Sequence, residues 1–102
     1  MRIRQTSRTS SVLQELGRRI ERLRLQRNQS LADLAAAAGV GSATLQRLES
    51  GRNANLSTLV RVLRAMNRLS DLDNVIPEIE VSPFEISGSR KTPRRRASKS
   101  NG

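Results

Sequence analysis

Apolar residues recur every three or four positions along several stretches of the first 76 residues. This spacing places them on one face of an α-helix. We therefore predict an all-α fold of five helices, over residues 11–27, between Ser30 and Gly39, between Gly41 and Gly51, over residues 56–69 and, briefly, at about residues 71–75. The positions expected to face the core are Val12, Leu13, Leu16, Ile20, Leu23 and, less regularly, Leu25, followed by Leu34, Ala35, Ala38, Leu45, Leu48, Leu56, Leu59, Val62 or Leu63, and Met66.

Residues 30–51 combine two short helices with a glycine turn. Ser30 is a favourable N-cap, and Asp33 is the acidic half of a capping box. Gly39 comes where the first of these helices should end, because glycine adopts the left-handed conformation of a C′ position without a Cβ clash. The unit is either a helix-turn-helix or an ordinary pair of helices in a small bundle, and the spacing favours the helix-turn-helix.

The second helix of this unit has outward positions that suit DNA recognition. Gly41 or Ser42 is its expected cap. In a helix-turn-helix the second helix can enter the major groove of DNA, which is about 12 Å wide. Its small or polar outward positions, which could reach base edges, are Ser42, Ala43, Gln46 and Arg47.

Other helix ends and the C-terminal part follow from local signals. Thr9 or Ser10 is the expected N-cap of the first helix, Asn55 that of residues 56–69 and Ser70 that of the fifth helix. Pro77 should end the fifth helix, because the residue before a proline avoids the helical region. Residues 78–82 alternate weakly and predict a short strand or extended segment, and residues 83–86 could form a single helical turn.

The charge balance favours a polyanionic partner. Nineteen Lys and Arg residues against nine Asp and Glu residues give a formal charge of +10. Arginine, which dominates, pairs with phosphate and with guanine edges in a bidentate way. An arginine-rich composition inherited from a GC-rich genome would account for part of this bias without any function.

Composition also makes several classes of function improbable. The chain contains no Cys and no His, so a metal site, a cofactor and enzymatic activity are not expected. No membrane span and no signal peptide are predicted, so the expected location is the cytoplasm, associated with the nucleoid. Single-stranded RNA binding is a weaker alternative, because Phe84 is the only aromatic residue available for stacking.

The sequence therefore divides into four parts. Residues 1–10 form a basic arm that we expect to be disordered, and residues 11–76 form the helix-turn-helix domain. Residues 77–87 form an extended segment for a dimer or another partner. Residues 88–102 form a basic tail that we also expect to be disordered.

The block from Leu16 to about Leu72 resembles the lambda-repressor-like, Cro-type helix-turn-helix family. The resemblance rests on a Ser cap, Leu-Ala and Gly-Val at family spacing, then Thr44-Leu45 before Leu48-Glu49, a glycine and a Leu-rich last helix. It implies a five-helix fold and a homodimer that binds palindromic operators in double-stranded DNA.

The resemblance also assigns roles to individual residues. Arg24 and Glu49 match a partly buried structural salt bridge between the first and third helices. The base-reading positions it implies are again Ser42, Ala43, Gln46 and Arg47. The expected phosphate contacts are Ser30, Thr44, Arg52, Asn53, Asn55, Ser57 and Thr58. Leu31 departs from the family pattern, in which a Gln often contacts the backbone, and Ser42 is a short base reader, so specificity should depend mainly on Gln46 and Arg47.

A narrower resemblance begins at Asn55. The helix ending LRAMNRLSDLDNVIPE, then SPFEI and a basic tail, resembles HipB-like antitoxins, which repress their own operon and bind a HipA-like kinase toxin. It implies either an autoregulatory repressor or an interaction protein whose main role is to neutralise the toxin. The residues expected at a dimer or partner interface are Ile76, Ile79, Val81, Phe84 and Ile86. The alternative is that this segment folds back and caps its own domain.

Overall fold

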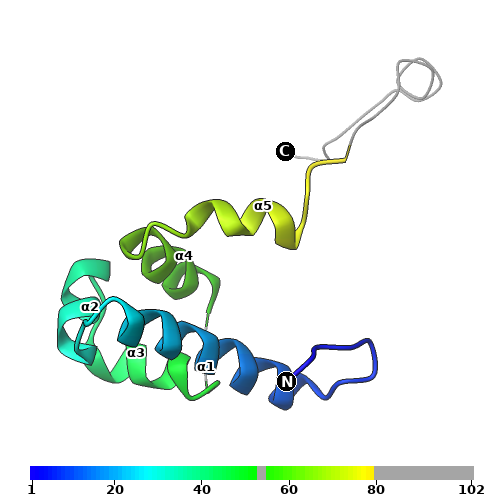
Figure 1. The fold of residues 1–102 in the computed structure, drawn as a ribbon, viewed down its shortest axis with the longest axis horizontal. Helices are drawn as coiled ribbons and strands as arrows, with labels where there is room; N and C mark the ends of the chain where they lie inside the picture. Colours follow the sequence, from blue (N-terminus) through cyan, green and yellow to red (C-terminus); the bar gives the residue numbers. More distant parts are fainter. Residues whose placement is uncertain (53–54, 80–102) are drawn as a thin grey trace. The chain divides into compact units, whose positions relative to one another are not determined.

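The computed structural model describes residues 1–52 and 55–79. The elements are α1 (Thr9–Gln26), α2 (Leu31–Ala38), α3 (Ser42–Glu49), α4 (Leu56–Ala65), the 3₁₀ helix η1 (Leu69–Asp71) and α5 (Leu72–Val75) (Figure 1). No strand occurs in these described ranges, and the predicted all-α fold with five α-helices is confirmed. The chain separates into two compact units, Met1–Asp71 and the part that starts at Leu72.

The core lies in the first unit. There α1 packs on α3, and α2 packs on both α3 and α4. The buried apolar side chains are those of Ile20, Leu34, Ala35, Ala38, Leu45, Leu48, Val62, Leu63 and Met66. Seven of them were predicted to face inward, and Val62 and Leu63, which were predicted as alternatives, are both buried. Helical periodicity therefore located most of the core.

The capping signals of the middle helices are confirmed. Ser30 Oγ accepts a hydrogen bond from the Asp33 amide at 3.0 Å, and Asp33 Oδ2 accepts one from the Ser30 amide at 3.3 Å. Gly39 ends α2 with φ +71°, a left-handed conformation that favours glycine. Gly41 is the N-cap of α3, and Asn55 is the N-cap of α4.

The ends of three helices differ from the prediction. Helix α1 starts at Thr9 with Arg8 as its N-cap, so neither Thr9 nor Ser10 caps it. Helix α4 ends at Ala65 because Asn67, two residues on, has a left-handed φ of +59°. Ser70 lies inside η1 rather than capping α5.

Four predicted core residues are exposed. Leu13, Leu16 and Leu25 stand out from α1, and the side chain of Leu56, at the first position of α4, is 78% exposed. Helix α1 instead turns Gly17, Ile20 and Arg24 inward. The three leucines of α1 stay outside the core because its apolar residues spread over a broad side of the helix. The spacing of these residues does not determine which part of that side contacts α3.

The structure describes the N-terminal arm but not the last residues of the chain. Residues 1–8 precede α1, and the carbonyl oxygen of Met1 accepts a hydrogen bond from Arg19 Nη2 at 2.9 Å. Disorder of the arm stays a prediction. Residues 78–79 have no regular structure, and the predicted features at 80–102, including Val81, Phe84, Ile86 and the basic tail, lie outside the described residues. None of the helices that the structure describes is both long and apolar enough to cross a membrane.

Candidate nucleic-acid interface

Helix α3 is held by one side and exposes the other. Leu45 and Leu48 are buried, and α3 packs against α1, α2 and α4. The opposite side of the helix carries four exposed side chains, those of Ser42, Ala43, Gln46 and Arg47. The structure therefore brings all four predicted base-reading residues together on one accessible surface, the α3 outer face.

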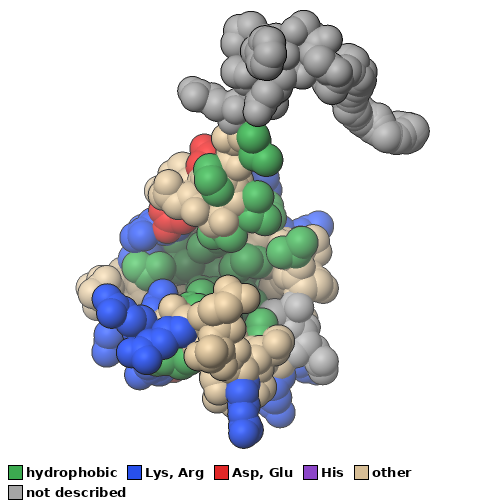
Figure 2. Space-filling view, turned by 90° about the vertical axis from the view of Figure 1, so that its right-hand side faces the viewer, with side chains coloured by type: hydrophobic (Ala, Val, Ile, Leu, Met, Phe, Trp, Pro, Cys, Tyr) green, Lys and Arg blue, Asp and Glu red, His purple; other side chains and the backbone are tan. Residues whose placement is uncertain are grey.

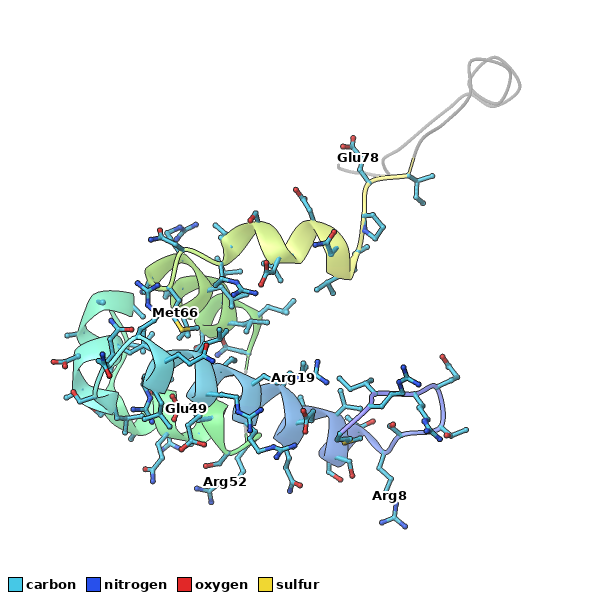
Figure 3. The ribbon with its side chains drawn as sticks, in the orientation of Figure 1. Arg8, Arg19, Glu49, Arg52, Met66 and Glu78 are labelled. Atoms are coloured by element: carbon cyan, nitrogen blue, oxygen red, sulfur yellow. The ribbon has the colours of Figure 1, made fainter. Side chains whose placement is uncertain are left out.

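A buried ion pair sets the position of α3 on α1. Arg24 Nε donates to Glu49 Oε2 at 2.8 Å, and Arg24 Nη2 donates to Glu49 Oε1 at 3.1 Å. Both side chains are about nine-tenths buried. Hydrogen bonding to Glu49 raises the pKa of Arg24 above its usual value. The pair is the one that the family resemblance implied, and its two hydrogen bonds fix the orientation of the Glu49 carboxylate at the end of α3. Figure 3 labels Glu49.

The same arginine also orders the link from α1 to α2. Arg24 Nη1 donates to the carbonyl oxygen of Gln29 at 3.0 Å. Gln29 directly precedes Ser30, the N-cap of α2. One side chain thus ties the entry of α2 and the end of α3 to α1, so the two helices of the helix-turn-helix share an anchor.

The start of α4 contains a compact side-chain cap. Asn55 Oδ1 accepts hydrogen bonds from the Thr58 amide at 2.8 Å and from Ser57 Oγ at 2.9 Å. The Thr58 side chain is buried. Thr58 was predicted to contact phosphate, but its side chain is enclosed and its amide already has a partner, so it is not among the phosphate contacts that we propose below.

The other expected phosphate contacts fall into three groups. Ser30, Arg52, Asn55 and Ser57 are exposed, and Arg52 projects away from the ribbon in Figure 3. Thr44 is half-buried within the first turn of α3. Asn53 lies outside the described residues. Ser30 precedes α2, Arg52 follows α3, and Asn55 and Ser57 lie at the start of α4. Amides and hydroxyls at such helix ends can approach a DNA backbone.

Sequence reasoning missed the position of Arg61. Its Nη1 donates to the carbonyl oxygen of Gly39 at 3.4 Å, and the side chain remains exposed. A cation from α4 therefore lies beside the turn between α2 and α3. No short-range pattern could have shown this, because 22 residues separate the two partners.

A second charged cluster lies on α1. Glu15 is only 7% exposed and accepts hydrogen bonds from Arg18 and from Arg19 Nε, the latter at 2.9 Å. Hydrogen bonds from Arg18 and then Arg19 lower the pKa of Glu15 to about 2. The spacing of Glu15 and Arg19 was visible in the sequence as an i,i+4 pair. The burial of the carboxylate was not.

No group of three or more Asp or Glu side chains in residues 1–52 and 55–79 is placed to hold a metal ion. What this part of the molecule offers is a set of amides, hydroxyls and guanidinium groups, which suits a polyanion.

Comparison with known proteins agrees with this geometry. Residues 15–73, more than half of the chain, match a family model described as a helix-turn-helix domain. The match begins within α1, ends in the first residues of α5 and includes every residue of the α3 outer face. No curated protein matches the chain.

Proposed function

Because the chain belongs to the helix-turn-helix domain family, we propose that it is a sequence-specific transcriptional repressor that binds a palindromic operator as a homodimer. In this proposal α3 enters the major groove, and Gln46 and Arg47 read base edges. A repressor of this kind acts in the cytoplasm, associated with the nucleoid. The exposed α3 outer face, held in place by the Arg24–Glu49 pair, is the observation that carries the proposal.

The chemistry of the α3 outer face supports base reading. Arginine can bind guanine O6 and N7 in a bidentate way, and glutamine can bind adenine N6 and N7. Ser42 and Ala43 are small, so they allow the helix to approach the groove closely. The two long readers occupy consecutive positions on the exposed side of α3, which gives them access to neighbouring base pairs.

Surrounding groups support a fixed register on the DNA backbone. Ser30 and Asn55 stand at the N-termini of α2 and α4, and Arg52 follows α3. Contacts of this type position a protein without reading sequence. The overall charge of +10 adds long-range attraction to the duplex.

Selection of bound sequences from random duplex DNA tests the proposal. We expect enrichment of an inverted repeat whose half-sites lie one or more helical turns apart, about 10–10.5 base pairs per turn. The control is the Gln46→Ala/Arg47→Ala variant, which should still bind duplex but enrich no motif. Failure of the wild-type chain to enrich any sequence would reject sequence-specific recognition.

The apolar surface after α5 favours a second role, that of a HipB-like antitoxin. Val75, Ile76 and Ile79 are exposed, the two isoleucines by 83% and 82%. Exposed apolar side chains that gather in one patch mark surfaces that another protein covers, and these three lie within five residues of one another. We propose that residues 76–86 contact the dimer partner or a HipA-like kinase toxin, and that Val81, Phe84 and Ile86 extend the contact.

Truncation after Asn74 tests this role, with truncation after Ser87 as the control that removes only the basic tail. Loss of the dimer in analytical ultracentrifugation for the shorter chain alone would place the segment at the self-interface. A dimer that still binds operator but no longer captures a purified kinase toxin would place it at the toxin interface. If both truncated chains behave alike, the segment has no interface role.

A further inference from the structure

The outer side of α1 carries a concentration of positive charge that the proposed function does not use. Arg18, Arg19 and Arg22, here called the α1 arginine cluster, are exposed and line one shallow hollow together with Met1 and Glu15. Figure 3 labels Arg19 on α1, and Figure 2 shows that basic side chains outnumber acidic ones on the face in view.

The cluster holds more positive than negative charge. Glu15 is the single carboxylate in the hollow, and Arg18 and Arg19 both bind it. Arg22 forms no ion pair among residues 1–52 and 55–79. Each guanidinium has five N–H donors. Arg18 and Arg19 use only a few of theirs on Glu15 and Met1. Donors therefore remain for another anion.

The cluster lies away from the α3 outer face. Gly17 marks the side of α1 that meets α3, because a Cβ at this position would lie 2.4 Å from the carbonyl oxygen of Glu49. Successive residues of an α-helix are about 100° apart, which places Arg19 and Arg22 roughly 140–160° around α1 from Gly17 and Arg18 about 100° from it. These arginines can therefore contact another molecule while α3 reads bases.

We propose that the α1 arginine cluster is a second phosphate-binding surface, which holds the backbone of a DNA duplex independently of the α3 outer face. Arg18 and Arg22 are four residues apart, about 6 Å along the helix. One strand of B-DNA carries a charge every 3.4 Å or so of its axis, so the pair spans about two phosphates. The hollow is open to solvent, and four of its five lining residues are charged, which suits a continuous backbone better than an enclosed small anion.

The test measures duplex binding in full-length Arg47→Gln/Arg52→Gln protein, in which the α3 side has lost two cations. Fluorescence anisotropy with a labelled random-sequence duplex is recorded over a range of KCl concentrations. Adding Arg18→Gln/Arg22→Gln should lower the slope of log K against log [KCl] by about two and weaken binding at least about tenfold at 0.1 M KCl. The matched control is Arg27→Gln/Arg64→Gln, which removes the same charge from exposed positions outside the cluster and should change the slope by well under one.

Two further measurements distinguish duplex binding from damage to the fold and from binding of a small anion. Glu15→Gln removes the carboxylate from the hollow and should strengthen duplex binding, whereas damage to the fold would weaken it. Sodium pyrophosphate, added at constant ionic strength, should not displace the duplex at low millimolar concentration. Displacement would overturn the duplex assignment and identify a small phosphate-bearing anion as the occupant.

Two results of the salt titration would overturn the proposal. Equal loss of binding in the cluster variant and the matched control would show that only net charge matters and would overturn the proposal. Unchanged binding in the cluster variant would do the same. None of these results depends on an operator, so they can succeed or fail separately from sequence-specific recognition by α3.

Discussion

Gly17 of α1 lies directly against the backbone of Glu49 at the end of α3. A Cβ built on Gly17 would lie 2.4 Å from the Glu49 carbonyl oxygen and 2.5 Å from that of Leu48. The two helices can approach this closely only because Gly17 has no side chain. The contact lies within the same pair of helices that the Arg24–Glu49 ion pair joins.

Replacing Gly17 by alanine should therefore destabilise the domain. Alanine is favoured over glycine within a helix by up to about 1 kcal/mol. The clash is with backbone and should outweigh that gain, for a net loss of about 2 kcal/mol in the free energy of unfolding. Urea denaturation measures the change. Gly41→Ala is the control, because the nearest atom to a Cβ there is Thr44 Oγ1 at 3.9 Å. Since Gly41 is the N-cap of α3, this substitution should itself cost below about 1 kcal/mol. A Gly17→Ala protein as stable as the control would contradict the close approach.

Removing one partner of the buried ion pair should be more costly than removing a surface charge. Glu49→Ala leaves Arg24 largely buried without its carboxylate, and we expect a loss of about 3 kcal/mol in the free energy of unfolding. Glu21→Ala is the control, since Glu21 is exposed and lies 3.9 Å from Arg24, and it should cost below about 1 kcal/mol. Equal melting temperatures for the two variants would show that the Arg24–Glu49 pair is not structural.

Arg47 should carry base specificity at the operator. Arg47→Ala is expected to cost about 1–3 kcal/mol of binding free energy and to relax the preference at one base pair in each half-site. Arg64→Ala, an exposed arginine on α4, serves as the control and should leave base preference unchanged. Quantitative binding to single-substituted operators measures both effects. A uniform loss on every sequence would identify Arg47 as a phosphate contact instead.

Glu15 should make stability depend on pH in the acid range. Its pKa falls from 4.5 to about 2 in the folded protein, because Arg18 and Arg19 donate hydrogen bonds to the carboxylate. A group with a lowered folded pKa stabilises the fold above its unfolded pKa, and this contribution is lost as the pH falls from about 4.5 towards 2. The melting temperatures of wild type and Glu15→Gln should thus differ most at pH 6 and converge towards pH 2.

A direct titration checks the same assignment. The side-chain carboxyl of Glu15, followed by NMR, should keep its ionised chemical shift down to about pH 3. A midpoint near 4.5 would show that the arginines do not hold the carboxylate in solution.

Local sequence signals were enough to predict the two helices and the turn of the helix-turn-helix. The capping box of Ser30 and Asp33, the left-handed Gly39 and the inward Leu45 and Leu48 each depend on residues close in sequence, and each is present in the structure. Since buried Leu45 and Leu48 define one side of α3, the exposure of Gln46 and Arg47 on the other side follows from helical geometry alone. The Arg24–Glu49 pair needed the family resemblance, because 25 residues separate the two side chains.

Tertiary packing decided what local patterns leave open. The apolar residues of α1 span a broad side of the helix, and only the approach of Gly17 to α3 selects which part is buried, so Ile20 is enclosed while Leu16 is exposed. Thr58 looked like a phosphate ligand in sequence, but the packing of α4 encloses its side chain. The sequence by itself determined where the helices begin and end to within a few residues and which surface of α3 is available. Contacts between residues far apart in the chain determined which side of α1 is buried and whether Thr58 is enclosed. Such contacts depend on how closely two backbones can approach.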